Sequence, residues 1–443
     1  MEISALSKIY KEAGIVGAGG AGFPTYAKLN SNAKTILLNC AECEPLLRLH
    51  RQLLKFHAPE IVSAFDETRK SVGAEEGIVC IKEHYKGAID AVTALLPEYP
   101  ALKLKVLRKV YPAGDEVMLI YDATGKVVRP GGLPIESGVA VFNVETMYNA
   151  YHALKGEPLV SKLVTIAGEV AHPKTLRLPL GAKLSEAIKL AGGETIKDYV
   201  YWVGGPMMGR IASPSDPVTK TTNSVFVLPS NSFVVNKLRS DVKIEIGRAA
   251  ASCCQCRTCT DMCPRNNVGH PIEPHKIMRA AACNDFSDVS AFLNTFYCCG
   301  CGVCELYACP QGLSPRKLIQ TIKGALRANG IKPPKDTQAS EVNPMRDFRR
   351  VPLERLVTRL GVKKYQADAP LDNQLIDGFS EVNILCSQHI GAPAVPVVKV
   401  GDKVERGQVV AKAAEGLSVN IHASISGIVT GVTPKCITVK KVD

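Results

Sequence analysis

Residues Cys253–Pro264 read CCQCRTCTDMCP, and this stretch determines the fold of the region around it. Its cysteines follow C-x2-C-x2-C-x3-C before a proline, and Cys298–Pro310, CCGCGVCELYACP, follows C-x2-C-x2-C-x4-C before a proline. Three closely spaced cysteines on one loop can bind three irons of a cubane cluster, and a more distant fourth cysteine beside a proline binds the other cluster. The two motifs therefore predict two [4Fe–4S] clusters in a short helical segment.

Each predicted cluster takes three cysteines from one motif and one from the other. The first set is Cys253, Cys256, Cys259 and Cys309, and the second set is Cys298, Cys301, Cys304 and Cys263. Structural zinc would need two C-x2-C pairs separated by a longer loop. Disulfides would require export, and the N-terminus carries no apolar secretory segment. Cys254 and Cys299 are expected to be spare thiols.

Composition indicates a globular chain in a reducing compartment. The chain has 443 residues, 46% of them hydrophobic and 22% charged, which predicts about three domains. Half of its 16 cysteines lie in the two motifs, so a cytoplasmic location is expected. No run approaches the ~18 apolar residues of a membrane span, although attachment to the surface of a membrane complex stays open.

The net charge of +12 is concentrated near the cysteine motifs. Between Lys237 and Lys364 there are 21 Lys and Arg against 11 Asp and Glu. Eight ligating thiolates would make the cluster sites negative, so this excess is expected to compensate them, and no nucleic-acid role is expected. Five arginines outside the motifs are expected to form either a solvated basic face or a contact for an acidic partner such as a flavodoxin: Arg346, Arg349, Arg350, Arg355 and Arg359.

The sequence of the N-terminal half of the chain predicts two domains. Residues 1–158 alternate buried strands, Thr35–Asn39 and Gly77–Ile81, with helices, His57–Ser71 and Tyr85–Leu96, which is typical of an α/β domain with a parallel sheet. Residues 159–240 begin with an apolar strand and contain a short amphipathic helix, Leu184–Leu190. A small β-grasp-like α+β domain fits this second pattern.

The C-terminal half predicts the cluster domain at 241–330, a linker with one helix at 331–378, and an all-β domain at 379–443. The strands of the last domain resemble the lipoyl- and biotinyl-type barrel-sandwich. Ser418, Val419 and Asn420 stand where that fold carries its modified lysine, so no attached cofactor is expected and the domain is expected to be structural.

A glycine-rich loop, Gly17–Thr25 (GAGGAGFPT), is the second informative motif. Its backbone N–H groups could cradle a phosphate. Three polar loops follow along the chain, Asn39–Pro45 (NCAECEP), Tyr111–Glu116 (YPAGDE) and Asn143–Thr146 (NVET). The first of these follows a predicted strand, and ligands bind at the carboxyl ends of strands in open α/β sheets.

These four motifs, in this order, resemble the FMN- and NADH-binding region of the flavin subunit of respiratory complex I. They are more similar to the RnfC protein of the Rnf complex and to PduS-type cobalamin reductases. The segments Cys263–Arg279 and Cys304–Pro310, and the C-terminal position of the barrel-sandwich, resemble the PduS type most. The resemblance implies a Rossmann-like FMN/NADH-binding domain, an SLBB-like β-grasp domain, a ferredoxin-like dicluster domain and a barrel-sandwich hybrid.

The resemblance also implies roles for individual residues. The FMN phosphate side would be contacted by Gly17, Gly19, Gly20 and Lys28, and the ribityl chain and ring would lie near Asn39 and Glu42. The rest of the pocket would be formed by Gly114, Asp115, Glu116, Asn143 and Thr146. Phe23 and Glu44 would help to receive the nicotinamide nucleotide. No side chain is assigned a catalytic role, because the chemistry belongs to the cofactors.

The implied activity is an NADH-dependent oxidoreductase that passes electrons through FMN and both clusters to a partner. That partner could be a flavodoxin, a ferredoxin, a corrinoid enzyme or another member of a complex. One alternative is a cobalamin reductase in a bacterial microcompartment. The other is an electron-wiring subunit that binds no NADH, because Ala18 and Ala41 stand where complex I has arginine and aspartate.

Overall fold

The computed structural model describes residues 1–442 and begins with an α/β domain. Its sheet has four parallel strands in the order β3-β2-β1-β5, as predicted for this part of the chain. The strands are β3 (Leu102–Leu107), β2 (Glu76–Lys82), β1 (Thr35–Cys40) and β5 (Val139–Asn143). Side chains on β1 alternate between two cores: Ile36 and Leu38 lie in one, and Leu37 lies in the other.

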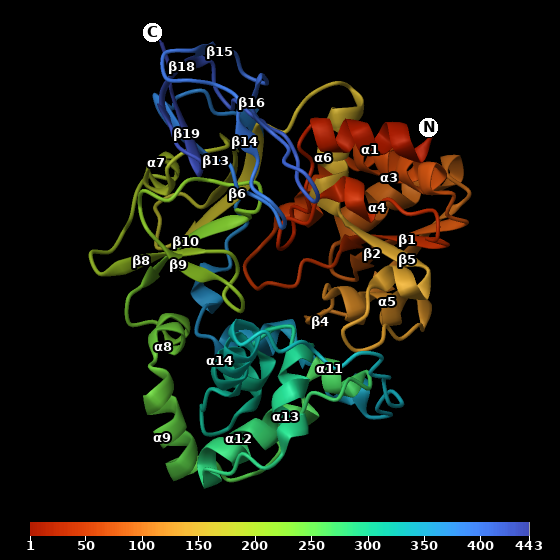
Figure 1. Ribbon diagram of the computed structural model, residues 1–443, viewed down its shortest axis with the longest axis vertical. Helices are drawn as coiled ribbons and strands as arrows, with labels where there is room; N and C mark the ends of the chain where they lie inside the picture. Colours follow the sequence, from red (N-terminus) through yellow and green to blue (C-terminus); the bar gives the residue numbers. More distant parts are fainter. Residues whose placement is uncertain (443) are drawn as a thin grey trace.

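Helices cover both faces of this sheet (Figure 1). One face packs against α1 (Ile3–Glu12), α2 (Leu49–Phe56), α3 (Ala58–Val72), α4 (Lys86–Leu95) and α6 (Val144–Leu154). The opposite face packs against α5 (Glu116–Thr124). The glycine-rich loop follows α1 and is closed at its base by a bridge between Val16 and Pro24. This arrangement brings the loop to the edge where the parallel strands end.

The second domain is built on a six-stranded mixed sheet in the order β12-β7-β6-β10-β8-β9. Its strands are β6 (Ser161–Gly168), β7 (Lys174–Pro179), β8 (Tyr199–Val203), β9 (Arg210–Ala212), β10 (Ser224–Pro229) and β12 (Leu371–Leu375). The predicted helix is present as α7 (Leu184–Leu190). The edge strand β12 comes from the segment that was predicted to be a linker.

The cysteine motifs lie in a helical domain at the bottom of Figure 1. Its helices are α8 (Phe233–Arg239), α9 (Val242–Ser252), α10 (Thr258–Asp261), α11 (Pro264–Asn267), α12 (Pro274–Cys283), α13 (Val289–Leu293) and α14 (Pro315–Ala328). A π-helical turn, Val303–Ala308, leads into Cys309. Within residues 1–442, no helix has the length and apolar character needed to cross a membrane.

The segment 331–378 ties the domains together. It contains the predicted helix as α15 (Leu353–Arg359) and also β11 (Val351–Pro352), which pairs with β4 (Val110–Tyr111) of the first domain. It then supplies β12 to the second sheet. The segment is therefore packed against two other domains, which its polar sequence did not predict.

The last domain consists of two small sheets, β13-β19-β18-β15 and β14-β16-β17. Their strands are β13 (Glu381–Leu385), β14 (Val395–Pro396), β15 (Lys403–Val404), β16 (Val409–Lys412), β17 (Ile421–His422), β18 (Gly427–Val432) and β19 (Cys436–Lys440). Its core is continuous with that of the second domain, since Val382 and Val439 cluster with Val164.

The loop between β16 and β17 is buried against the first domain. Ser418 and Val419 are fully buried, and the N–H of Asn420 donates to the carbonyl of Lys11. Lys220 of the second domain completes this junction by donating to the carbonyls of Gly14 at 2.7 Å and Asn420 at 3.3 Å. A modified side chain at this loop would have no room to swing.

Candidate flavin cleft and paired cysteine quartets

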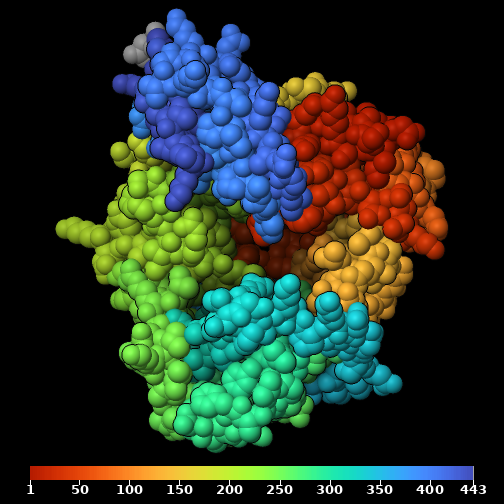
Figure 2. Space-filling model, in the orientation of Figure 1, coloured from red at the N-terminus to blue at the C-terminus, as the bar shows by residue number. Residues whose placement is uncertain are grey.

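Two adjoining cavities lie at the carboxyl ends of the parallel strands. Their volumes are about 280 Å³ and about 470 Å³, and they share five lining residues: Gly19, Gly20, Ala21, Asn39 and Asn143. Figure 2 shows a hollow at the centre of the molecule between the first, second and helical domains. All thirteen residues predicted to bind flavin or nucleotide line one cavity or the other. We call the two together the cleft.

The glycine-rich loop forms one wall of the cleft with its backbone. The N–H of Gly17 donates to the carbonyl of Phe23 at 2.9 Å, and the N–H of Ala18 donates to Thr146 Oγ1 at 3.0 Å. A Cβ added at Gly19 would lie 2.4 Å from Asn143 Nδ2, whereas one added at Gly20 would meet no atom within 4 Å. Gly20 therefore presents bare backbone to the cleft, which is the cradle that a phosphate needs.

Strand ends supply the polar groups of the opposite wall. Asn39 lies near the end of β1, donates to the carbonyl of Gly114 at 3.0 Å and accepts from the N–H of Ala41 at 3.0 Å. Asn143 ends β5 and caps α6 by accepting from the N–H of Glu145 at 2.9 Å. A Cβ at Gly114 would lie 2.4 Å from the carbonyl oxygen of Ala41. Glycine is thus required there for the two loops to meet.

Lys28 is the cation of the smaller cavity. Its ammonium donates to Glu116 Oε1 at 3.2 Å and to the carbonyl of Val141 at 3.1 Å, and it lies 6.0 Å from the centre of the Phe23 ring. The side chain is only partly buried. An anion in the cavity would therefore meet an ammonium that is already held in position.

Two glutamates line the larger cavity with different partners. The carboxylate of Glu42 accepts from the N–H of His50 at 3.3 Å, and its other oxygen lies 3.8 Å from Arg51 Nε. Glu44 Oε2 accepts from the N–H of Met207 at 2.8 Å, while its Oε1 is buried without a partner. Burial raises the pKa of Glu44 to about 7.

Several residues of the cleft were not predicted from the sequence. The second domain contributes Gly204, Gly205, Met208 and Asn223, and the helical domain contributes Cys299 and Cys301. The segment Val203–Gly209 (VGGPMMG) carried a signal in its paired glycines, because a Cβ at Gly205 would lie 2.2 Å from Glu44 Oε2. Nothing in the sequence indicated that Cys299 and Cys301 of the second cysteine motif would line the cleft.

The motif cysteines lie close enough together for their thiols to affect one another's pKa values. Burial raises the pKa of Cys259 to about 12, and the nearby thiols of Cys309, Cys256 and Cys253 contribute to this shift. Burial also raises the pKa of Cys263 to about 12, with a contribution from Cys298. We call Cys253, Cys256, Cys259 and Cys309 the outer quartet, and Cys263, Cys298, Cys301 and Cys304 the inner quartet.

The surroundings of the quartets fit iron–sulfur clusters. Backbone N–H groups of Gly300 and Leu313 donate to the sulfurs of Cys298 and Cys309, each at 3.3 Å, and Thr258 Oγ1 donates to Cys256 at 3.3 Å. Such donors stabilise thiolates and tune cluster potentials. Among residues 1–442, no three His, Cys, Asp or Glu side chains are placed to hold a single metal ion. A cubane needs wider spacing, because its four thiolates bind four different irons.

The inner quartet adjoins the cleft and the outer quartet adjoins solvent. Cys301 and Tyr111 both line the larger cavity. The hydroxyl of Tyr111 donates a hydrogen bond to the carbonyl of Cys301 at 2.7 Å. Cys301 and Cys304 are buried, whereas Cys256 is exposed. The order from the cleft to the surface is therefore inner quartet and then outer quartet.

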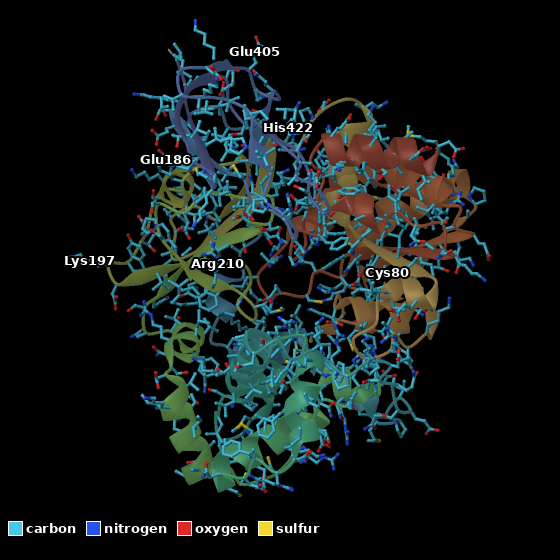
Figure 3. All side chains as sticks on the ribbon, in the orientation of Figure 1. Cys80, Glu186, Lys197, Arg210, Glu405 and His422 are labelled. Carbon is cyan, nitrogen blue, oxygen red and sulfur yellow. The ribbon has the colours of Figure 1, made fainter. Side chains whose placement is uncertain are left out.

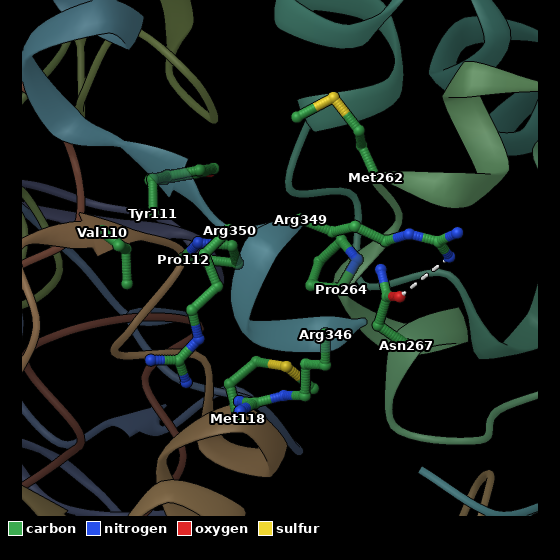
Figure 4. Close-up of a pocket in the computed structure, with 10 residues that line it drawn as sticks. All are labelled: Val110, Tyr111, Pro112, Met118, Met262, Pro264, Asn267, Arg346, Arg349 and Arg350. Atoms are coloured by element: carbon green, nitrogen blue, oxygen red, sulfur yellow. Dashed lines mark hydrogen bonds between the residues drawn. The ribbon is translucent and has the colours of Figure 1, made fainter. Parts of the chain in front are cut away.

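The predicted basic face is not formed by all of its arginines. Arg346 and Arg350 are largely buried and both pair with Asp122 of α5. Figure 4 shows Arg346, Arg349 and Arg350 in a small pocket between the first and helical domains, where Arg349 Nη1 donates to Asn267 Oδ1 at 3.5 Å. The prediction of a solvated basic face was wrong for Arg346 and Arg350, because their partner Asp122 lies more than 200 positions earlier in the chain.

Four protein-family models match successive parts of the chain. They are the Nuo51 FMN-binding domain at residues 10–152, the SLBB domain at 163–211, the 4Fe-4S dicluster domain at 252–314 and the RnfC barrel sandwich hybrid domain at 357–442. The multidomain architecture, the FMN-binding domain and the two [4Fe–4S] clusters predicted from the sequence are thereby confirmed.

Known proteins match over nearly the whole chain. The cobalamin reductases PduS of Salmonella typhimurium and Citrobacter freundii are each 40% identical, covering 97% of this chain and 95% of their own. An RnfC-type protein from the Na+-translocating ferredoxin:NAD+ oxidoreductase complex of Acetobacterium woodii is 32% identical over 60% of this chain and 58% of its own. The chain is an FMN- and iron–sulfur-containing electron-transfer oxidoreductase, and it belongs to the PduS family.

Proposed function

We propose that the cleft binds FMN and receives NADH, and that the two quartets hold the clusters that carry electrons to a partner. The observation that supports this most is the wall shared by the cleft and Cys301. When bound, FMN accepts two electrons as a hydride from NADH, which becomes NAD+, and releases them one at a time. The residues of the chain must bind and orient the FMN and the clusters, shield them from solvent and set their potentials.

Binding of the flavin falls to the two walls of the cleft. Gly19 and Gly20 offer backbone N–H groups to the phosphate, and Lys28 offers its ammonium at the same end. Gly17 also lines this end, where its N–H donates to the carbonyl of Phe23 and holds the loop in shape. Asn39 and Glu42 lie at the other end with the amide and carboxylate groups that can hydrogen-bond a ribityl chain and a ring. The remaining pocket residues, Gly114, Asp115, Glu116, Asn143 and Thr146, position these groups.

The nicotinamide nucleotide would enter beside Phe23 and Glu44. Phe23 offers an aromatic face in the smaller cavity, and Glu44 lies where the second domain covers the larger cavity. Ala18 is buried against the chain, whereas Ala41 lines the cleft. A methyl group at position 41 leaves space for the flavin and lacks the charge that complex I has there.

The inner quartet would hold the cluster nearer the flavin, and the outer quartet would hold the cluster nearer solvent. Cys304 lies close enough to both Cys263 and Cys259 for their thiols to affect its pKa, which is raised chiefly by burial. The two quartets are thus neighbours. Electrons would cross from the cleft to the inner quartet, from there to the outer quartet, and then to a partner.

The acceptor to test first is a corrinoid. Two relatives that cover nearly the whole chain are named cobalamin reductases, and the Rnf relatives belong to ion-translocating complexes. We place this chain with the former because the match extends from end to end. We expect it to work with a redox partner protein in the cytoplasm or in a microcompartment.

The test is anaerobic reconstitution with FMN, iron and sulfide, followed by visible spectra during addition of NADH and then of cob(II)alamin. Bleaching of the flavin and iron–sulfur bands by NADH, and their recovery on adding the corrinoid, would support the full proposal. Bleaching by dithionite but not by NADH would overturn NADH as donor and favour an electron-wiring role. Bleaching without recovery would exclude free corrinoid as the acceptor.

A further inference from the structure

A further cavity lies apart from the cleft, where the first, second and last domains meet. Its volume is about 290 Å³, and it has no lining residue in common with the cleft. Its walls come from α6 of the first domain, from β6 and β7 of the second domain, and from Arg406 and Gly407 of the last domain. The proposed path of electrons uses none of these residues. We call this space the α6 cavity.

Arg177 of β7 lines the α6 cavity and is held there by neutral partners. Its Nε donates to Asn373 Oδ1 at 3.0 Å, and its Nη2 donates to the Tyr148 hydroxyl at 2.7 Å. Its third nitrogen, Nη1, has no hydrogen-bond partner among residues 1–442, and no carboxylate of those residues forms an ion pair with Arg177. Arg177 is therefore a positive charge in a fixed position with two free N–H groups.

The hydroxyl of Tyr148 also has a free proton. Tyr148 lines the cavity and is only 3% exposed. Its oxygen accepts from Arg177 Nη2 and, at 2.9 Å, from Asn373 Nδ2. A hydroxyl has two lone pairs and one proton, so both lone pairs are used while the proton has no acceptor in the part of the chain that the structure describes. A buried donor without an acceptor is costly, and an oxygen of a bound ligand would satisfy it.

Two more polar groups line the α6 cavity. Arg406 reaches it from the last domain, and no described carboxylate forms an ion pair with this exposed arginine. His152 of α6 is bonded through Nδ1 to Glu157 at 2.9 Å, whereas its Nε2 is buried without a hydrogen-bond partner. The unsatisfied groups of the lining therefore belong to both domains that flank α6 and to α6 itself.

The carboxylates that line the α6 cavity already have basic partners. Glu145 is buried in an ion pair with Lys162, and Glu157 is bonded to His152. With His152 counted as neutral, Lys162 and the two arginines give three positive charges against these two carboxylates. The excess charge is positive and the two guanidiniums are the unpaired groups, so the cavity favours an anion.

We propose that the α6 cavity binds a small phosphate monoester. The free donors lie on α6, on β7 and on the last domain, and so approach from three directions. This arrangement suits the tetrahedral oxygens of a phosphate better than the planar pair of a carboxylate, and arginine binds phosphate through paired N–H groups. A phosphate monoester can also donate a proton to His152 Nε2 or accept one from it.

The remaining wall of the α6 cavity suits the organic part of the ester. Leu159, Leu163 and Leu375 line it, and the first two are buried. An apolar group placed against these leucines would add to the affinity that the phosphate provides. The proposal goes beyond the proposed function and does not depend on it, because the cavity and the cleft are lined by different residues.

The test is isothermal titration calorimetry of the full-length protein, reconstituted with FMN and clusters and freed of unbound FMN. Bound FMN then occupies the phosphate cradle of the cleft. Phenyl phosphate is the probe, benzoate replaces its phosphate by a carboxylate, and inorganic phosphate lacks its ring. Phenyl phosphate should bind the wild-type protein about tenfold more tightly than either comparison ligand.

Three variants each remove one donor from the α6 cavity: Arg177→Met, Tyr148→Phe and Arg406→Met. Each should raise the Kd for phenyl phosphate by about tenfold. Arg406 is exposed, so Arg406→Met tests the site even if a change at the buried network prevents folding. The matched control is Arg210→Met, because Arg210 is 62% exposed on the edge strand β9, away from the last domain (Figure 3). This control should bind phenyl phosphate as the wild type does.

The proposal would be overturned by wild-type protein that binds no phenyl phosphate, or by Arg177→Met and Arg406→Met proteins that bind it as tightly as the control does. Equal affinity for benzoate would overturn the choice of phosphate, and equal affinity for inorganic phosphate would overturn the choice of an ester. The titration uses neither NADH nor an electron acceptor. Failure of NADH to reduce the protein would therefore overturn the proposed donor and leave the phosphate site standing.

Discussion

Arg265 of the first cysteine motif forms a largely buried ion pair with Asp115 of the flavin cleft, with Nη2 and Oδ2 2.8 Å apart. The other oxygen of Asp115 accepts from the N–H groups of Val117 and Met118 and caps α5. Arg265 follows the inner cysteine Cys263 by two residues and also lies beside Cys299. One guanidinium therefore connects the wall of the flavin cleft with the inner quartet.

Replacing Arg265 should uncouple the flavin from the clusters. Arg265→Gln leaves the carboxylate of Asp115 buried without its cation, which costs about 3 kcal/mol for a pair of this kind. NADH should still bleach the flavin of this variant, but the iron–sulfur absorbance should bleach at least tenfold more slowly, as measured by stopped flow. Arg265→Lys should recover part of the rate. The exposed pair Arg210–Asp216 provides the control, and an Arg265→Gln protein no slower than Arg210→Gln would contradict the role.

Double cysteine variants can test how the motifs share their ligands. Cys263 and Cys298 belong to the same quartet, so Cys263→Ala/Cys298→Ala should lose one cluster and keep the other. Cys263→Ala/Cys253→Ala removes one ligand from each quartet and should lose both. Iron content and electron paramagnetic resonance after dithionite reduction measure the difference. Retention of one cluster by the second variant would show that each motif binds its own cluster. Cys436→Ser, far outside the motifs, is the control.

Gly20→Ala should weaken FMN binding without affecting the fold. The added methyl meets no protein atom within 4 Å, so it projects into the space of the cleft. Stability should stay within about 0.5 kcal/mol of wild type, whereas the FMN dissociation constant should rise about tenfold or more. Fluorescence titration of the apoprotein measures it. Gly324→Ala on α14 also meets open space and should bind FMN normally; equal affinities for the two variants would refute the phosphate cradle.

The raised pKa of Glu44 predicts that KM for NADH depends on pH. Burial raises its pKa from 4.5 to about 7, so the carboxyl is neutral below pH 7 and negative above it. The negative form repels the phosphates of NADH, and KM for NADH should therefore rise as the pH passes through 7. Glu44→Gln should remove this inflection. Steady-state assays from pH 6 to 8.5 with ferricyanide as acceptor measure KM, and an unchanged inflection in Glu44→Gln would assign the titration to another group.

Lys220 lies at the junction of three domains, and its lowered pKa predicts that the stability of the protein depends on pH. Burial lowers its pKa from 10.5 to about 7 in the folded protein, so the unfolded chain binds more protons between those values. This group therefore makes the folded state more stable as pH rises from 7 towards 10.5, by about 1.4 kcal/mol per pH unit. The melting temperature of wild type relative to Lys220→Met should rise between pH 7 and 9. The exposed Lys197→Met should show no such difference from wild type.

Local patterns predicted much of the fold. The strand Thr35–Asn39 was found as β1, and the helix Leu184–Leu190 was found with the same ends. These elements follow from apolar periodicity within a few residues of chain. The strand β12 could not be predicted in this way, because its pairing with β7 joins residues almost 200 positions apart. The pairing of Arg346 with Asp122 was missed for the same reason.

In the candidate site too, local motifs could be predicted from the sequence, and contacts between domains could not. The glycine loop and the polar strand ends were evident because each is a compact motif, and they converge on the cleft. The contact between Glu44 and Met207, and the presence of Cys301 in the wall, depend on how separate domains pack together. No spacing within either segment indicates these contacts, so the path from cleft to cysteines became visible only in the structure.

The central claim is that electrons pass from the cleft to the inner quartet before the outer quartet. It is tested most directly by freeze-quench electron paramagnetic resonance after mixing NADH with single-cluster variants. Protein lacking the inner cluster through Cys263→Ala/Cys298→Ala should show reduced flavin and an oxidised outer cluster. Protein lacking the outer cluster through Cys309→Ala should still reduce its inner cluster at the wild-type rate. Wild-type reduction of the outer cluster in the absence of the inner cluster would contradict the account.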